Sequence, residues 1–183
     1  MMGSKCLYFK IYIMLIYLIG YMGCGKTTIG KKLATQLNYS FLDLDDVIEQ
    51  NQKKSIAEIF EKDGQNTFRE IEKNNLHNTF NLKNTIISTG GGAPCFFDNM
   101  EQMNKYGTTI YIKLSPKALT KRLSNLRSSR PLIKEKTDEE LFNFIEKMLS
   151  ERELFYNKSL IKVNGIGLHT NRIIKAIETL SSS

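Results

Sequence analysis

The sequence predicts an α/β fold in which a mostly parallel sheet carries helices on both faces. Short apolar runs alternate with segments of helical spacing from one end of the chain to the other, which is the pattern of such sheets. A glycine-rich phosphate-binding pattern at residues 20–27 stands between an apolar run and a helical segment. The 183 residues, 41% hydrophobic and 25% charged, suit one ordinary globular domain.

Charge and cysteine content exclude several classes of protein. The net charge of +7 favours anionic partners without choosing among phosphates, carboxylates, nucleic acid or a membrane surface. The three cysteines, Cys6, Cys24 and Cys95, form no close pair, and neither histidine has a ligand-spaced partner. Neither a disulfide framework nor a zinc site is therefore predicted, and reduced thiols in the cytoplasm are the simpler interpretation.

The N-terminal apolar run has two interpretations. Residues 7–19 are nearly all apolar and follow Lys5, as in a signal peptide, although Lys10 interrupts them and they are too short for a membrane-spanning helix. A phosphate-binding loop, however, needs a strand directly before it. We therefore interpret residues 11–19 as the first, central strand, residues 1–10 as an extension of unknown role, and residues 11–183 as a single domain.

Residues 20–27 contain the pattern G-x-x-x-x-G-K-T. Glycines let successive backbone N–H groups face a phosphate, and the helix that follows at residues 28–37 adds its dipole. Lys26 would reach the β- and γ-phosphates, and the Thr27 hydroxyl would ligate Mg²⁺. A chance glycine-rich turn is the alternative, but the flanking strand and helix favour nucleotide binding by Gly23, Cys24, Gly25, Lys26, Thr27 and Thr28.

The remaining elements follow in order. Helix starts are marked by S-x-x-E at Ser55, by Pro116 and by T-D-E-E at Thr137, and Gly64 separates two helical segments. We expect strands at 41–45, 84–89, 108–114 and 160–163. We expect helices from 46 and from 55, and at 65–80, 99–105, 116–126, 137–156 and 171–180.

Acids and glycines end two of these strands. Asp43 and Asp45 stand two apart, so on a strand both would face one side, where they could hold a metal ion and accept a hydroxyl proton. The alternative is a solvated strand end. Three glycines at 90–92 either form a plain turn or leave the backbone bare for a ligand, and a run of three favours ligand contact.

Three arginines could recognise an anion. Arg69 is followed by Glu72, which could orient its guanidinium, Arg130 lies in a polar loop, and Arg152 lies near the end of a helix. Each alone could be a surface cation. Together with the phosphate loop they indicate a carboxylate clamp and a cation that closes over phosphates. The basic cluster at 117–136 permits nucleic-acid binding, but no nucleic-acid motif accompanies it, and we expect neither a nucleic-acid nor a membrane partner.

Six motifs together carry a family resemblance. The chain resembles the shikimate kinase family over about residues 16–180, with these motifs in order: GYMGCGKTT (20–28), FLDLD followed by IEQ, SIAEIFEKDGQNTFREIE (55–72), STGGGAP (88–94), RPLI (130–133) and ERELFY (151–156). The resemblance implies a three-layer α/β/α P-loop kinase of the nucleoside monophosphate kinase type, with a five-stranded parallel sheet. It also implies that ATP phosphorylates the 3-hydroxyl of shikimate, with Mg²⁺ as cofactor, in a monomer of the cytoplasm.

The resemblance also implies a role for each site residue. Lys26 would bind phosphates, Thr27 and Asp43 would hold Mg²⁺, and Asp45 would bind the ring hydroxyls and act as the base. Substrate contacts would come from Arg69, Arg152, Phe60, Phe68 and the N–H groups of Gly91 and Gly92. Arg130 would close over the phosphates from a lid at 127–137. No motif fixes the adenine contact, for which Arg122 is the candidate stacking cation and 169–172 a weaker candidate. Leu44 departs from the family, which usually has threonine there.

Two other functions remain open from the residues. One is a kinase of the same fold that acts on gluconate or a nucleotide. Arg69 and Arg152, together with the FREIE and GGG contexts, argue against this alternative. The other is a phosphate-loop module that binds nucleotide for regulation or grips nucleic acid, which a salt-dependent mobility shift would support.

Overall fold

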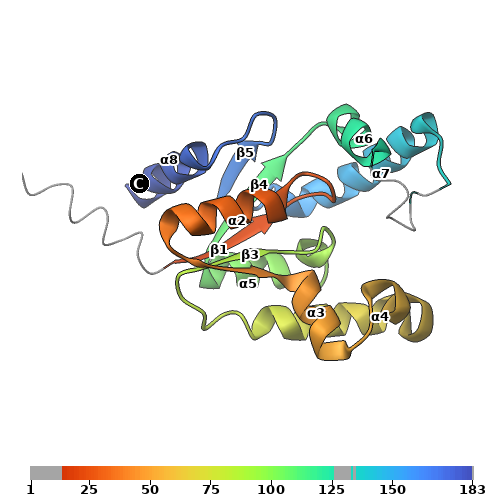
Figure 1. Cartoon of the computed structure of the whole chain (residues 1–183), viewed down its shortest axis with the longest axis horizontal. Coiled ribbons are helices and arrows are strands. Elements are labelled where there is room, and N and C mark those ends of the chain that lie inside the picture. The colour runs from red at the N-terminus through yellow and green to blue at the C-terminus, as the bar shows by residue number, and fades with distance from the viewer. Residues whose placement is uncertain (1–13, 126–132, 134, 183) are drawn as a thin grey trace, which may run out of the picture.

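The computed structural model describes residues 14–125, 133 and 135–182. Their strands form one five-stranded parallel sheet in the order β2-β3-β1-β4-β5 (Figure 1). The strands are β1 (Leu15–Ile19), β2 (Ser40–Asp43), β3 (Thr85–Ser88), β4 (Thr108–Lys113) and β5 (Ile161–Asn164). The α-helices are α2 (Lys26–Leu37), α3 (Leu44–Gln52), α4 (Ile56–His77), α5 (Asn99–Tyr106), α6 (Pro116–Ser124), α7 (Asp138–Tyr156) and α8 (Thr170–Ser181), and η1 (Ala93–Cys95) is a short 3₁₀ helix. The predicted α/β class and parallel sheet are confirmed.

Helices cover both faces of the sheet. Leu18 of β1 packs against α2, where a Cβ at Gly30 would lie 3.0 Å from its Cδ1 atom. Tyr111 of β4 is paired in register with Ile19 and packs against Tyr156 of α7. Because adjacent strand residues face opposite sides, α2 and α7 lie on opposite faces, with α8 beside α2 (Figure 1). The sheet is therefore the middle of three layers.

The central strand β1 is buried along its whole length, because β3 and β4 flank it and helices cover both its faces. It begins at Leu15, whereas we expected a strand from residue 11; Met14 lies outside the strand, and residues 11–13 lie outside the described part of the chain. The expected extension at 1–10 lies outside it as well. No helix within the described residues has the length and apolarity that crossing a membrane requires.

The predicted boundary in the acidic motif is wrong. We expected one strand through Asp45, but β2 ends at Asp43 and α3 begins at Leu44. The Asp43 carboxylate accepts a hydrogen bond from the Asp45 N–H at 3.2 Å and so caps α3. This cap satisfies an N–H that has no partner inside the helix. The two acids therefore come from a strand end and a helix start, and not from one strand face.

The expected break at Gly64 is a kink between two helical segments that together form α4. Gly64 has φ 81° and ψ 170°, a combination that only glycine adopts readily. The predicted capping boxes at Ser55 and Thr137 are both present. The second segment ends at His77, three residues earlier than expected.

The carboxyl ends of β1, β2 and β3 meet at one edge of the sheet because the strands are parallel and adjacent. The phosphate loop follows β1, the capping Asp43 ends β2, and the three glycines follow β3. The Thr89 N–H donates to the Leu18 carbonyl oxygen at 3.2 Å and so ties the glycine segment to β1. These three segments, far apart in the sequence, form the walls of one site.

Candidate active site

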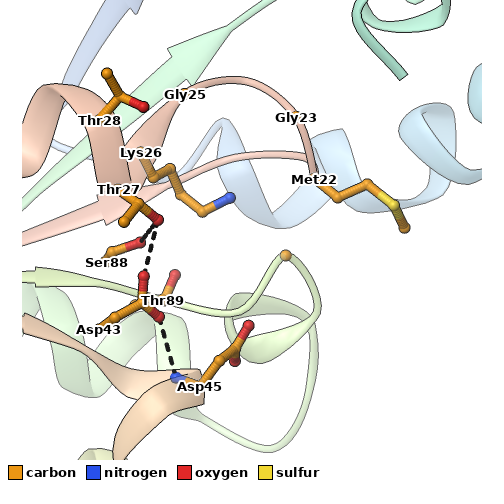
Figure 2. Close-up of a pocket in the computed structure, with 11 residues that line it drawn as sticks. Met22, Gly23, Gly25, Lys26, Thr27, Thr28, Asp43, Asp45, Ser88 and Thr89 are labelled. Atoms are coloured by element: carbon orange, nitrogen blue, oxygen red, sulfur yellow. Dashed lines mark hydrogen bonds between the residues drawn. The ribbon is translucent and has the colours of Figure 1, made fainter. Parts of the chain in front are cut away.

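The phosphate loop arches over the amine of Lys26 (Figure 2). Lys26 Nζ donates to the carbonyl oxygens of Gly20 at 2.8 Å and Tyr21 at 3.2 Å, and the residue is only 8% exposed. Gly23 has φ 78°, and a Cβ there would lie 2.9 Å from a methyl group of Leu123. Glycine at this position therefore permits both the turn of the loop and its close approach to α6.

Beneath the loop lies a pocket of about 330 Å³. On its floor, the Thr27 hydroxyl donates to the Asp43 carboxylate at 2.8 Å and lies 3.4 Å from Ser88 Oγ (Figure 2). Hydroxyl and carboxylate oxygens thus converge at the start of α2. The pocket is lined by Met22, Gly23, Gly25, Lys26, Thr27, Thr28, Asp43, Asp45, Ser88, Thr89 and Gly91.

Asp45 has an altered acidity in this pocket. Burial of its carboxyl, followed by repulsion from Asp43, raises the pKa of Asp45 to about 6, although the ammonium of Lys26 partly opposes the shift. Within the described residues, no group donates a hydrogen bond to the Asp45 carboxylate. Its oxygens are therefore open toward the pocket (Figure 2). A carboxylate of this pKa is mostly ionised at neutral pH and takes up a proton more readily than an exposed aspartate.

Arg69 lies in an aromatic enclosure at the other end of the site. Its guanidinium carbon lies 4.1, 5.0 and 5.9 Å from the ring centroids of Phe96, Phe68 and Phe60. Its Nη1 donates to the buried carboxylate of Glu72 at 2.5 Å. Burial raises the pKa of Glu72, and the Arg69 charge partly offsets this shift. The ion pair and the rings therefore hold the guanidinium in one orientation.

Arg152 approaches the same segment from α7. A Cβ at Gly91 would lie 3.4 Å from Arg152 Nη1, and a Cβ at Gly92 would lie 2.6 Å from Arg69 Nη2. The two guanidiniums therefore flank adjacent glycines, and a side chain at Gly92 would displace Arg69. Arg152 also lies over the Tyr21 ring of the phosphate loop, 5.3 Å from its centroid, so this cation connects the loop to the glycine segment.

Arg122 of α6 binds the outer side of the phosphate loop. Its Nη1 donates to the carbonyl oxygens of Cys24 at 3.0 Å and Gly23 at 3.4 Å. Its Nη2 donates to the carbonyl oxygen of Gly165 at 3.3 Å. Its expected contact with adenine stays a prediction. Arg130 and most of the expected lid fall on residues 126–132 and 134, which lie outside the described residues.

Comparison with known proteins decides the family. A family model described as Shikimate kinase matches residues 22–180, which include most of the phosphate loop, the two acids, the three glycines, Arg69 and Arg152.

The chain belongs to the shikimate kinase family.

Curated relatives of the kinase carry the same name. The shikimate kinase of Parabacteroides distasonis is 50% identical over 146 residues, which is 80% of this chain and 84% of that protein. The shikimate kinase of Bacteroides fragilis is 49% identical over 144 residues, or 79% and 80% of the two chains. The expected family and its ATP-dependent kinase activity are thereby confirmed.

Solved structures agree with the fold of the kinase. The crystal structure of shikimate kinase from Bacteroides thetaiotaomicron superimposes with a TM-score of 0.86 at 40% identity and covers 93% of this chain and 99% of that one. The structure of shikimate kinase from Acinetobacter baumannii in complex with shikimate superimposes with a TM-score of 0.81 at 28% identity. It covers 94% of this chain and 97% of that one. The P-loop kinase fold of the nucleoside monophosphate kinase type is therefore confirmed.

Sequence reasoning missed several residues of the site. Ser88 and Thr89 line the pocket, and their place directly before the glycines could have indicated this. Phe96, which lies closest to the Arg69 guanidinium, follows η1, and no sequence pattern predicted that turn. Tyr156 was part of a quoted motif without a role, although its position four residues after Arg152 places both on one helix face.

Proposed function

We propose that this kinase binds the carboxylate of shikimate between Arg69 and Arg152 and transfers the γ-phosphoryl group of ATP to the 3-hydroxyl, giving shikimate 3-phosphate and ADP. The observation that carries the proposal is the placement of the two guanidiniums against adjacent glycines, Gly91 and Gly92, beside the phosphate-loop pocket. Guanidiniums bind planar carboxylates through paired hydrogen bonds. The proposed phosphate site and the proposed carboxylate site would thus share the glycine segment.

The walls around Arg69 suit a small carbocyclic acid. Phe68 is buried and Phe60 is 37% exposed, with ring centroids 4.4 Å apart. Apolar rings exclude water from the guanidinium, and exclusion of water strengthens its attraction for a carboxylate. Glu72 is already paired with one edge of Arg69, so the substrate would bind at the remaining donors.

The phosphate loop would receive ATP. Its backbone N–H groups and the N-terminus of α2 attract phosphate oxygens. Lys26 now bonds carbonyl oxygens of the loop itself, and we propose that it exchanges them for the β- and γ-phosphates of bound ATP. An ammonium there would neutralise negative charge that develops as the γ-phosphoryl group leaves ADP.

Thr27 and Asp43 fit the needs of a magnesium ion. Their hydroxyl and carboxylate oxygens lie 2.8 Å apart beside the phosphate loop, and Mg²⁺ prefers few protein oxygens together with water and phosphate oxygens. Thr27 would bind the ion directly, and Asp43 would bind it through water. Bound Mg²⁺ would supply positive charge that offsets the charge of the ATP phosphates.

Asp45 would orient the acceptor hydroxyl. As the hydroxyl oxygen bonds to the γ-phosphorus and the bond from phosphorus to ADP breaks, the hydroxyl proton would pass to the Asp45 carboxylate. Its raised pKa, about 6, suits a group that must be ionised at neutral pH and still accept a proton.

We also propose that the enzyme acts as a monomer in the cytoplasm. Cys24 and Cys95 are free thiols, which suits a reducing compartment. Light scattering with size-exclusion chromatography tests the monomer, since a dimer mass at micromolar enzyme would contradict it.

Shikimate and its methyl ester provide the test of the carboxylate clamp. Arg69→Lys removes the planar donor pair while keeping the charge, and we expect the shikimate KM to rise about 10- to 100-fold because one or two charge-assisted hydrogen bonds are lost. The wild-type enzyme should bind the ester about as poorly as the variant binds shikimate. Lys73→Arg, on the same helix and outside the pocket, is the matched control. Equal KM values for ester and acid in the wild type would contradict the clamp.

A further inference from the structure

Tyr156 is a buried residue beside the site, and the mechanism proposed above gives it no role. It is 0% exposed at the end of α7, and its ring packs against Tyr111 with centroids 5.0 Å apart. Its hydroxyl donates to the carbonyl oxygen of Gly91 at 2.5 Å. Burial raises the pKa of Tyr156 above its usual range, so the hydroxyl keeps its proton at neutral pH and remains a donor.

The bond to Gly91 fixes more than one oxygen atom. The Gly91 carbonyl and the Gly92 N–H belong to the same peptide unit, which is planar and trans, so the two groups point in opposite directions. Holding the carbonyl toward α7 therefore holds the Gly92 N–H away from α7. Glycine on both sides of this peptide leaves it free to rotate in the absence of such an anchor.

The Gly92 N–H is available to a ligand. Within the part of the chain that the structure describes, no residue accepts a hydrogen bond from the N–H of Gly91 or Gly92. Gly91 lines the phosphate pocket and Gly92 touches Arg69. A peptide between them is thus placed between the proposed phosphate and carboxylate sites.

Arg152 lies one helical turn before Tyr156 on α7, so the two residues share a face of the helix. The Arg152 guanidinium lies close enough to partly offset the effect of burial on the pKa of Tyr156. One turn of α7 therefore carries both a proposed carboxylate ligand and the anchor of the adjacent peptide.

We infer that Tyr156 is a positioning residue for shikimate: its hydroxyl holds the Gly91–Gly92 peptide so that the Gly92 N–H faces the acceptor site in register with Arg152. The inference rests on the carboxylate clamp proposed above. A tyrosine that merely fills the core would affect stability alone, whereas a positioning residue affects the binding of one substrate.

Tyr156→Phe tests the inference because it keeps the ring and removes only the hydroxyl. We expect the shikimate KM to rise about 10-fold, the loss expected for one hydrogen bond, while the ATP KM stays within about twofold of the wild type. Tyr17→Phe is the matched control. Tyr17 is equally buried and its hydroxyl bonds Thr79 at 2.8 Å, but neither residue lines the pocket, so both KM values should stay unchanged.

Three results would overturn the inference: a wild-type shikimate KM in Tyr156→Phe, an equal rise in both KM values, or the same rise in Tyr17→Phe. Arg152→Lys, measured in parallel, separates this inference from the clamp. If Arg152→Lys keeps the wild-type KM, the clamp is wrong; if only Arg152→Lys raises it, the inference about Tyr156 alone is wrong.

A measurement on the wild-type enzyme decides the matter if Tyr156→Phe does not fold. Nuclear magnetic resonance of the amide-labelled protein should show the Gly92 amide proton moving downfield when shikimate is added, as expected for a new hydrogen bond. An unmoved Gly92 amide at saturating shikimate would overturn the inference.

Discussion

Asp45 is the side chain whose chemistry depends most on its surroundings. Its carboxyl is desolvated beneath the phosphate loop and repelled by Asp43, which together raise the pKa of Asp45 to about 6. If the ionised form is required, kcat/KM should fall as the pH drops below about 6. In Asp45→Asn this acid limb should disappear and kcat should fall at least about 100-fold. An unchanged acid limb in the variant would assign the titration to another group.

Asp45→Asn should also change the free energy of unfolding. The pKa of Asp45 is about 6 in the folded state, above the ordinary value of 3.8. Between about pH 4 and 6, the folded state therefore holds a proton on Asp45 that the unfolded state has lost. Ionised Asp45 thus costs stability above pH 6, and the cost fades as the pH falls toward 4. Urea unfolding should find Asp45→Asn more stable by about 1–3 kcal/mol at pH 8, with a smaller gain at pH 4.5. A variant no more stable at pH 8 would contradict this.

The ammonium of Lys26 carries a further prediction at the residue scale. Lys26→Met keeps the length of the side chain and removes its charge, so turnover should fall at least about 1,000-fold because the charge that develops on the phosphates is no longer neutralised. Circular dichroism should show a folded protein. Lys32→Met, an exposed position on the same helix, is the control and should retain full activity. Activity in a folded Lys26→Met variant would remove Lys26 from the mechanism.

Single residues differed in how far the sequence predicted their place. Lys26 and Thr27 could be placed because the phosphate loop is a local structure set by its own glycines and its flanking strand and helix. The meeting of Arg69 with Phe96 could not be predicted, because it depends on how α4 packs against the segment after η1, and contacts between distant segments leave no local pattern.

Among the elements, α4 depends on a single residue. Its kink at Gly64 joins the segment that carries Phe60 to the segment that carries Phe68 and Arg69, and it brings the two rings to 4.4 Å. No atom lies within 4 Å of a Cβ built at Gly64, so the cost of a side chain there is conformational rather than steric crowding.

Gly64→Ala should therefore destabilise the enzyme by about 1–3 kcal/mol, because alanine is strained at these angles. It should also raise the shikimate KM, since a shifted kink moves Phe60 away from Arg69. Thermal unfolding and shikimate titration measure the two effects. Gln65→Ala, at the next and exposed position, should change neither. Wild-type stability in Gly64→Ala would show that the kink does not need glycine.

The start of α3 shows why an element boundary was missed. Leu42 to Asp45 alternate apolar and acidic residues, as a half-buried strand does. Asp43 also caps helices well, however, and its carboxylate bonds the Asp45 N–H. Two local preferences competed, and the cap prevailed because β2 pairs with β3 only as far as Asp43. The boundary matters, since it places Asp45 at the start of a helix that faces the pocket.

For the whole molecule, the alternation of apolar runs and helical segments was enough to predict a parallel sheet with helices on both faces. The order of strands, β2-β3-β1-β4-β5, could not be derived from that alternation, because periodicity does not say which strands pair. The five apolar runs already gave the number of strands in the sheet, and the family resemblance agreed with it. Because the strands are parallel, however, the phosphate loop, the acids and the glycines could be predicted to lie at the same edge of the sheet.

The choice of acceptor is a property of the whole site. Phosphate loop and acids alone would serve many small-molecule kinases, and the paired arginines beside Gly91 and Gly92 favour an acceptor with a carboxylate. Gluconate also has a carboxylate but lacks a ring for Phe60 and Phe68 to contact, and nucleoside monophosphates present a phosphate instead. Shape and charge together therefore predict a strong preference for shikimate.

The most direct test is ADP release from ATP and Mg²⁺ by the purified enzyme, with shikimate, gluconate or nucleoside monophosphates as acceptors. We predict release that depends on shikimate and stays at the background rate with the other acceptors. Release with gluconate or a nucleotide and none with shikimate would contradict the proposed site.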